Sequence, residues 1–190
     1  GDDTALAVMS KMHRQIYDYF RQQFAQVTNP PIDSLREVSV MSLETCYGPE
    51  LNVFDETPEH AKRLVTTSPV LSHKKLQSIL NNPYFETSEI SLEYSRDTSL
   101  SDALKLLKKE VEKIVTEGKT IIHLKESLPE KGSLPINALL AVGCVHQHLV
   151  KIGLRSKANI VISSSSARDT HQIACLIGFG ATAVYPSLAY

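Results

Sequence analysis

Apolar positions near the N-terminus repeat at the spacing of an amphipathic helix. Intervals of three and four residues place side chains on one helix face; these positions are Met12, Ile16, Phe20, Phe24 and Val27. The helix must end before Pro30 and Pro31, because proline lacks a backbone N–H and disfavours the α conformation in the residue before it. We therefore expect a helix that is followed by a stiff, extended loop over residues 28–33.

The middle of the chain is patterned more weakly. Residues 34–97 contain Gly-Pro and Thr-Pro turn signals but little helical or strand periodicity. One short helix is predicted over 72–80, where the hydroxyl of Ser72 is suited to cap a free backbone amide. Residues 1–97 are therefore predicted to be rich in helix and loop, beginning with a helical and loop-rich N-terminal third.

From residue 98 onward, strand-like apolar runs alternate with amphipathic helices. Strands are predicted over 120–124, 159–162 and 183–185, and helices over 101–117, 135–152 and 167–177. Ser101 is the expected cap of the first helix, Pro135 the start of the second, and Gly178-Phe179-Gly180 the end of the third. Strands separated by helices pair in parallel through right-handed crossovers. Residues 98–190 are therefore predicted as a βαβαβ part of an α/β fold, either an open sheet or a partial (β/α) barrel.

The composition is that of an ordinary globular protein. Hydrophobic residues make up 42% of the 190 residues and charged residues 22%, which argues against disorder. The net charge of −1 lacks the basic excess of a general nucleic-acid binder, and no apolar run approaches the roughly 20 residues that span a bilayer. The cysteines are odd in number and scattered, at Cys46, Cys144 and Cys175. We therefore expect a cytoplasmic protein with no nucleic-acid or membrane partner.

The first residues carry neither an initiating methionine nor a targeting signal. The chain begins Gly1-Asp2-Asp3, and nothing there resembles a signal or transit peptide. We expect a segment of a longer polypeptide, and a processed or tag-trimmed protein is the alternative.

A run of four serines is the candidate anion-binding site. Ser163, Ser164, Ser165 and Ser166 follow a predicted strand and precede a predicted helix. Free amides at a helix N-terminus, with hydroxyls beside them, can bind phosphate. An ordinary strand-to-helix turn with a serine cap explains the same run, and no glycine-rich phosphate motif occurs. A free-standing α/β protein that binds a small phosphorylated ligand therefore stays an alternative.

Other reactive side chains do not form a convincing constellation. His171 lies near Asp169 and Ser166, but catalytic triads converge from separate elements rather than from one short segment. His146 and His148 point about 200° apart on a helix, so they are not expected to chelate a metal ion. The cysteine thiols have no basic neighbour in sequence that would activate them for a thiol-dependent enzyme. No catalytic, cofactor or metal residue is predicted from these patterns.

Two long stretches resemble the central domain of the glutamate synthase large (alpha) subunit. The first consists of GDDTALAVMS and YDYFRQQFAQVTNPPIDSLREVSVMSLET, and the second of LPINALLAVGCVHQHLVKIGLR and ANIVISSSSARDTHQIACLIGFGATAVYPSLAY. Both occur in the family's order and cover well over half of the chain. The string FAQVTNPPID with the following RE is highly specific. We therefore interpret residues 1–190 as a single fragment of that central domain.

The chain departs from the family pattern at two strand ends. The family often has LSDR where this chain has Leu124-Lys125-Glu126-Ser127, and it commonly has an acidic residue where this chain has the serine run. These departures weaken a role for either loop in a required chemical step. The fold assignment is unaffected, because the apolar periodicity is intact.

The resemblance implies an architectural role in an oxidoreductase that acts on CH–NH2 donors. Such enzymes hydrolyse L-glutamine in a glutaminase domain and pass ammonia through an internal tunnel. An FMN domain with a 3Fe-4S cluster then reduces the 2-iminoglutarate formed from 2-oxoglutarate, which gives L-glutamate. The implied partners are the glutaminase and FMN-binding domains of the same polypeptide and a small subunit. The fragment itself is expected to bind no cofactor and to be non-catalytic in isolation.

The resemblance also implies that backbone at Thr28 and Asn29 lines the tunnel entrance. The neighbouring prolines would hold this loop rigid, and its carbonyl groups would accept hydrogen bonds from ammonia. A packing loop that anchors the first helix explains the same residues equally well. A fragment of this kind should also expose apolar surface that faces neighbouring domains.

Overall fold

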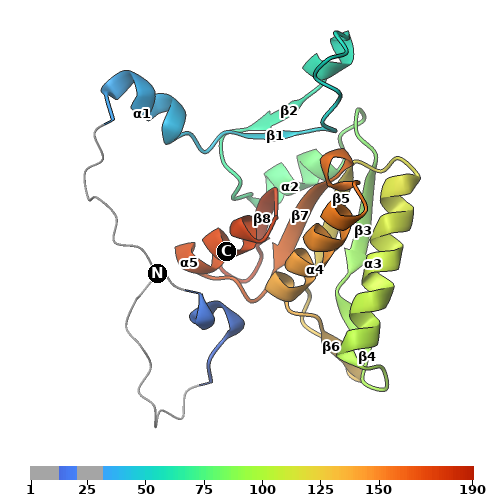
Figure 1. Ribbon diagram of the computed structural model, residues 1–190. Coiled ribbons are helices and arrows are strands. Elements are labelled where there is room, and N and C mark those ends of the chain that lie inside the picture. The colour runs from blue at the N-terminus through green and yellow to red at the C-terminus, as the bar shows by residue number, and fades with distance from the viewer. Residues whose placement is uncertain (1–12, 21–31) are drawn as a thin grey trace.

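The computed structural model describes residues 13–20 and 32–190, which surround one parallel β-sheet (Figure 1). The sheet has the strand order β3-β5-β7-β8, and each neighbouring pair is parallel. Its strands are β3 (Thr87–Ser91), β5 (Ile121–Lys125), β7 (Asn159–Ser164) and β8 (Ala183–Pro186). The predicted α/β fold with parallel strands and intervening helices is therefore confirmed. The described residues form an open four-stranded sheet and no closed barrel.

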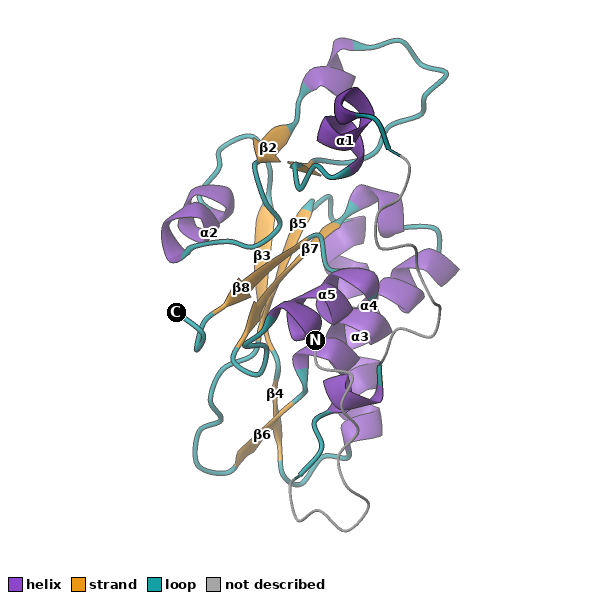
Figure 2. Cartoon of the chain, turned by 90° about the vertical axis from the view of Figure 1, so that its left-hand side faces the viewer, coloured by secondary structure: helices purple, strands orange, loops and turns teal. Residues whose placement is uncertain are grey.

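Helices cover both faces of the sheet. Helices α3 (Leu100–Thr116), α4 (Ala138–Lys151) and α5 (Thr170–Gly178) pack on one face, and α2 (His73–Leu80) packs on the other (Figure 2). Within the described residues, no helix is both long enough and apolar enough to cross a membrane.

Smaller elements extend the fold beyond the sheet. In Figure 1, α1 and the antiparallel pair β1-β2 form an arm at one end, and the pair β4-β6 lies at the other. Their bounds are α1 (Ser34–Val40), β1 (Thr45–Tyr47), β2 (Leu64–Thr66), β4 (Glu93–Ser95) and β6 (Ser133–Pro135). Among the described residues, short 3-10 helices occupy Ile16–Tyr19, Pro58–Ala61 and Arg155–Lys157.

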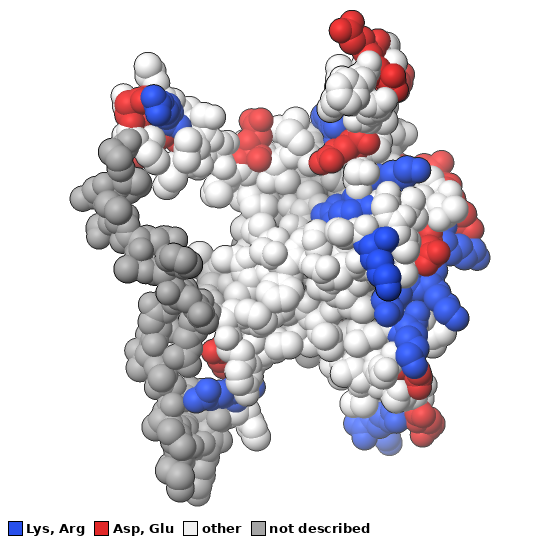
Figure 3. Space-filling view, viewed as in Figure 1, with Lys and Arg blue, Asp and Glu red and all other residues white. Residues whose placement is uncertain are grey.

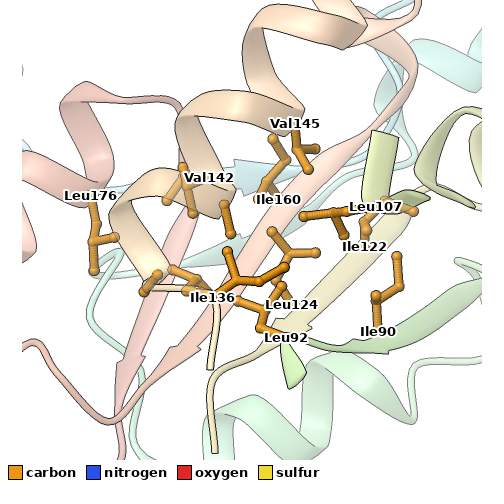
Figure 4. Packing of buried hydrophobic residues seen from close by; sticks show 14 of the residues in the cluster. Ile90, Leu92, Leu107, Ile122, Leu124, Ile136, Val142, Val145, Ile160 and Leu176 are labelled. Atoms are coloured by element: carbon orange, nitrogen blue, oxygen red, sulfur yellow. The ribbon is translucent and has the colours of Figure 1, made fainter. Parts of the chain in front are cut away.

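Alternating strand residues supply two hydrophobic clusters, one on each face of the sheet. Ile122, Leu124 and Ile160 point toward α3 and α4, where they pack against Leu107, Val142 and Val145 (Figure 4). The intervening positions Ile121, Val161 and Ala183 join a second cluster with Leu76 and Ile79 of α2. Burial of each Leu, Ile or Val side chain stabilises the fold by about 1.5–3 kcal/mol. Because both faces are covered, the centres of β5 and β7 carry apolar residues on both sides of the sheet.

Two predicted helix starts are wrong by a few residues. Ser99, not Ser101, caps α3: its hydroxyl accepts a hydrogen bond from the Asp102 amide at 3.1 Å. Pro135 does not begin α4 but ends β6, where it lies opposite Glu93 of β4. The side chain of Asn137 caps α4 instead. In the second case, pairing with a distant strand overrides the local preference of proline for a first helical turn.

Two other predicted helix ends are confirmed. The Ser72 hydroxyl accepts a hydrogen bond from the Lys75 amide at 3.4 Å at the start of α2. At the end of α5, Gly180 takes the left-handed conformation with φ +114°, and the Ala181 amide donates back to the Leu176 carbonyl at 3.0 Å. This geometry is typical of a helix end that is closed by glycine.

The prediction of a continuous N-terminal helix is wrong in the part of it that the structure describes. A single 3-10 turn occupies Ile16–Tyr19, and both Gln15 and Phe20 have extended backbones. The Tyr17 side chain is fully buried, and the Phe20 ring packs edge-on against Phe179 at 4.9 Å. These apolar residues are therefore held by contacts with the folded α/β part rather than by a helix of their own. The predicted tunnel residues Thr28 and Asn29 lie outside the described residues.

Candidate functional site

The carboxyl ends of the parallel strands carry a concentration of polar side chains. On the side of the sheet that α2 covers, a cavity of about 300 Å³ opens at these ends. Its lining includes Glu89, His123, Lys125, Ser163, Ser165 and Tyr185. These residues come from β3, β5 and β8 and from β7 with its following turn. The open edge of parallel strands is where α/β proteins usually place their sites.

Glu126 joins two strand ends to the start of a helix. It follows β5 directly and is only 5% exposed. Its carboxylate accepts backbone N–H bonds from Ala138, the first residue of α4, at 3.0 Å, and from Ser165 and Ser166 at 2.9 Å each. A carboxylate at a helix N-terminus also interacts favourably with the helix dipole. These backbone amides therefore already donate to a carboxylate of the chain itself, that of Glu126.

The serine hydroxyls complete the same network. The Ser164 hydroxyl donates to Glu126 Oε2 at 2.8 Å, and the Ser166 hydroxyl donates to the same oxygen at 2.9 Å. The Tyr17 hydroxyl lies 3.2 Å from the Ser166 hydroxyl, which connects the N-terminal segment to the cluster. Of the four serines, Ser163 turns away toward His123. A phosphate at this turn would have to displace Glu126, so phosphate binding stays an untested prediction.

A second arrangement crosses the sheet on the cavity side. Glu89 of β3, His123 of β5 and Ser163 of β7 form one hydrogen-bonded row. Glu89 Oε2 lies 3.0 Å from His123 Nδ1, and His123 Nε2 lies 2.6 Å from Ser163 Oγ. His123 is 3% exposed, whereas the Glu89 side chain is half exposed. The row therefore connects a carboxylate at the surface to a buried hydroxyl through an imidazole ring.

Burial of the imidazole ring favours a neutral histidine in this row. Burial lowers the pKa of His123 below its ordinary value, although the Glu89 carboxylate opposes this effect. Partial burial raises the pKa of Glu89, but the hydrogen bonds from Lys125 and His123 and the positive charge of Lys125 outweigh it and hold the pKa below its ordinary value. Lys125 Nζ lies 3.1 Å from Glu89 Oε1. The acid is therefore charged near neutral pH while the imidazole is uncharged.

The remaining sequence candidates have separate partners. His171 Nε2 lies 3.0 Å from the Tyr17 carbonyl oxygen and 3.7 Å from Cys175 Sγ, while Asp169 caps α5 through the Gln172 amide at 2.8 Å. His171 is therefore bound to the N-terminal segment and not to a serine of the 163–166 turn.

The two histidines of α4 have different partners, and the thiols of α4 and α5 are not activated. His146 accepts a hydrogen bond from Arg155 Nε at 3.0 Å, and His148 lies 2.9 Å from Glu112 of α3. Burial raises the pKa of the Cys144 and Cys175 thiols, which disfavours their thiolate forms. In the part of the chain that the structure describes, no three metal-binding side chains converge.

The sequence interpretation missed Glu89, His123 and Glu126. Glu89 was hidden because β3 lies in the weakly patterned region, where no strand was expected. His123 did give a signal, since it is the one titratable side chain within an otherwise apolar run, IIHL. Glu126 also gave a signal in the sequence, because an acidic residue directly after a buried strand faces the turn that follows the neighbouring parallel strand.

Comparison with known proteins identifies the family. The model of the glutamate synthase central domain matches residues 1–190. A ferredoxin-dependent glutamate synthase of Oryza sativa subsp. japonica is 44% identical over 197 residues, and the glutamate synthase [NADPH] large chain of Bacillus subtilis is 38% identical over 192. Each alignment covers all of this chain but only 12% of the relative's length. The chain therefore belongs to the glutamate synthase central domain family.

Proposed function

We propose that this chain is the connecting domain of a glutamate synthase polypeptide, placed between a glutaminase domain and an FMN-binding domain. The observation that carries the proposal is the family match over all 190 residues, together with relatives of which the chain spans 12%. In this proposal, the parent enzyme makes L-glutamate from L-glutamine and 2-oxoglutarate. No step of that synthesis takes place on the described residues, which supply rigid walls and spacing.

Exposed apolar side chains on the arm support a connecting role. Leu35 and Val38 of α1 are 87% and 78% exposed, and Phe54 in the loop between β1 and β2 is 89% exposed. Further exposed apolar residues of this region are Val40, Met41, Leu43 and Val53. Such clusters on a folded surface are typical of sites that contact other proteins or domains. We assign this arm to contacts with the rest of the polypeptide.

The distribution of charge also supports such contacts. In Figure 3, charged side chains gather over the side that carries α3, while the surface over α4 and α5 is largely free of Lys, Arg, Asp and Glu. Val150 of α4, Ile177 of α5 and Phe179 directly after α5 are between 36% and 51% exposed. A depletion of charge combined with exposed apolar groups is the composition of an interface core.

The tunnel role is proposed for Thr28 and Asn29. On the N-terminal side of the 21–31 segment, Tyr17 and Phe20 are fixed against the α/β part by the contacts described above. On its C-terminal side, the Asp33 carboxylate caps α1 through the Leu35 and Arg36 amides at 3.1 and 2.9 Å. The N-terminal flank is thus fixed to the α/β part, whereas the C-terminal flank continues into the exposed helix α1. Fixing of the N-terminal flank fits the packing-loop alternative as well, so the tunnel role needs an experiment that separates the two.

The cofactors of the parent enzyme are proposed to lie in other domains. An iron–sulfur cluster needs several cysteine thiolates around it. Cys46, Cys144 and Cys175 lie on β1, α4 and α5 respectively and do not converge. The residues described here therefore do not fit the 3Fe-4S cluster, and FMN and this cluster are assigned to the FMN-binding domain. A small subunit, or ferredoxin in its place, would deliver the electrons to that domain.

Substitution of Asn29 by tryptophan in the complete polypeptide tests the tunnel role. We expect the bulky ring to obstruct ammonia, so that glutamine-dependent glutamate formation falls by about tenfold or more, a loss of about 1.4 kcal/mol in transition-state terms. Glutamine hydrolysis should persist, and added ammonium should restore glutamate formation because it enters without the tunnel. Parallel assays of glutamine consumption and of glutamate release measure the two half-reactions.

The matched control places the same side chain elsewhere. Asn81 is exposed at the end of α2, so Asn81→Trp should leave both half-reactions within about twofold of the wild type. Equal losses of both half-reactions in Asn29→Trp would favour the packing-loop role. Unchanged half-reactions would remove Thr28 and Asn29 from the tunnel wall.

A further inference from the structure

We infer that Ser163 is an activated nucleophile, with His123 as its general base and Glu89 as the group that orients the histidine. The three residues come from three neighbouring strands, 34 and 40 positions apart in sequence, and meet in one row. A serine, a histidine and an acid that converge from separate elements have the geometry of nucleophilic hydrolases. The inference is independent of the proposed connecting role and concerns a different reaction.

The hydrogen-bond roles in the row follow from its chemistry. The Glu89 carboxylate can only accept, so the facing Nδ1 atom of His123 must carry the proton. The other ring nitrogen, Nε2, then presents its lone pair to the Ser163 hydroxyl at 2.6 Å. This is the tautomer that a general base requires. Lys125, bound to the second Glu89 oxygen, holds the carboxylate in place.

The cavity beside Ser163 would give a small substrate access to its hydroxyl. Ser163 and His123 both line the space of about 300 Å³, which is at the lower end of the range for small-molecule sites. Apolar side chains of Leu76, Leu128 and Leu188 line the same space. A small ester with a short acyl chain matches this mixture of size and polarity.

The reaction balances without any further co-reactant except water. The Ser163 oxygen bonds to the acyl carbon of the ester, and its proton passes to His123 Nε2. The same proton then leaves with the departing alkoxide, which breaks the ester bond. Water attacks the acyl-serine with His123 again as the base, which releases a carboxylic acid and restores the hydroxyl.

A fluorophosphonate probe on the complete polypeptide tests the inference. The probe phosphonylates an activated serine: a P–O bond forms to Ser163, the P–F bond breaks, and the proton passes to His123. Peptide mass spectrometry should locate the adduct on Ser163. We expect His123→Gln to slow labelling at least about 100-fold, as is typical for loss of a general base. Glu89→Gln should slow it less, and Ser163→Ala should abolish the adduct.

A second serine of the sheet provides the control for the labelling experiment. Ser91 is an exposed serine at the end of β3 with no histidine partner in the row, so Ser91→Ala should label like the wild type. An unlabelled Ser163, or equal labelling rates in the wild type and His123→Gln, would overturn the inference.

A pH profile of the unmodified protein covers the case in which His123→Gln fails to fold. The labelling rate should be constant above about pH 6.5, the ordinary pKa of histidine, and should fall only below it, because burial lowers the pKa of His123. The other titratable groups that line the same cavity are Glu89, Lys125, Glu126, His73 and Tyr185. A rate that rises with pH without a plateau would contradict a histidine base.

Discussion

Replacement of Glu126 by alanine is expected to lower the free energy of local unfolding around the start of α4 by about 3 kcal/mol or more. The carboxylate accepts hydrogen bonds from the buried Ala138 amide, from the partly buried Ser165 and Ser166 amides and from two serine hydroxyls. Each buried donor that loses its acceptor costs about 1–3 kcal/mol, because it has already been removed from water. Entry of water into the space left by the side chain keeps the total below the sum of these costs.

Hydrogen exchange measured by mass spectrometry on the complete polypeptide reports this change. Peptides that contain Ala138, Ser165 and Ser166 should exchange about a hundredfold faster or more, since each 1.4 kcal/mol is a factor of ten. Glu130→Ala is the control, because Glu130 is an exposed acidic residue in the same loop, and it should change the exchange by less than about threefold. Slow exchange in Glu126→Ala would show that these amides have other acceptors.

Replacement of Gly180 by alanine is expected to destabilise the contact between α4 and α5 by about 3 kcal/mol. A Cβ atom at this position would lie 2.3 Å from His146 Nδ1 and 2.7 Å from His146 Cβ, so the histidine must move. That movement would disturb Arg155, which donates to His146 and to the Gly180 carbonyl at 2.9 Å. The φ of +114° adds backbone strain of about 1–2 kcal/mol for any residue with a side chain.

Gly118→Ala separates the cost of backbone strain from the cost of the steric clash with His146. Gly118 also has a positive φ, +96°, but nothing lies within 4 Å of the added Cβ. We expect it to cost only the strain, about 1–2 kcal/mol. For Gly180→Ala, hydrogen exchange is measured in α5 and at the start of β8 and compared with the wild type. For Gly118→Ala, it is measured at the end of α3. Equal effects in the two variants would mean that His146 moves aside without cost.

The regular part of the fold could be predicted because its signals are local. The helical spacing of Leu107, Val111 and Val115 and the short, mainly apolar runs at the centres of β5 and β7 specify their elements without any knowledge of neighbours. Apolar runs between helices also predict parallel pairing, which the sheet confirms. Where the predictions fail, a distant contact is the cause. Pro135 is paired with β4, and Phe20 is held by Phe179.

The candidate site could be predicted only in part, because its contacts join residues that are far apart in sequence. The serine run was recognised as able to bind an anion, but its amides are matched to Glu126, about 40 positions earlier. The row of Glu89, His123 and Ser163 depends on the strand order β3-β5-β7 and on its register. Neither the order nor the register is readable from β3 alone, whose short run mixes polar and apolar residues.

Electron cryomicroscopy of the complete polypeptide would show whether this chain joins two catalytic domains, as we propose. We expect residues 1–190 to lie between the glutaminase and FMN-binding domains, with the α1 arm and the α4–α5 surface buried against them. We also expect backbone at Thr28 and Asn29 to border the passage between the two active sites. A map in which the two domains contact each other directly, with this chain at the periphery and both surfaces in solvent, would rule out this arrangement.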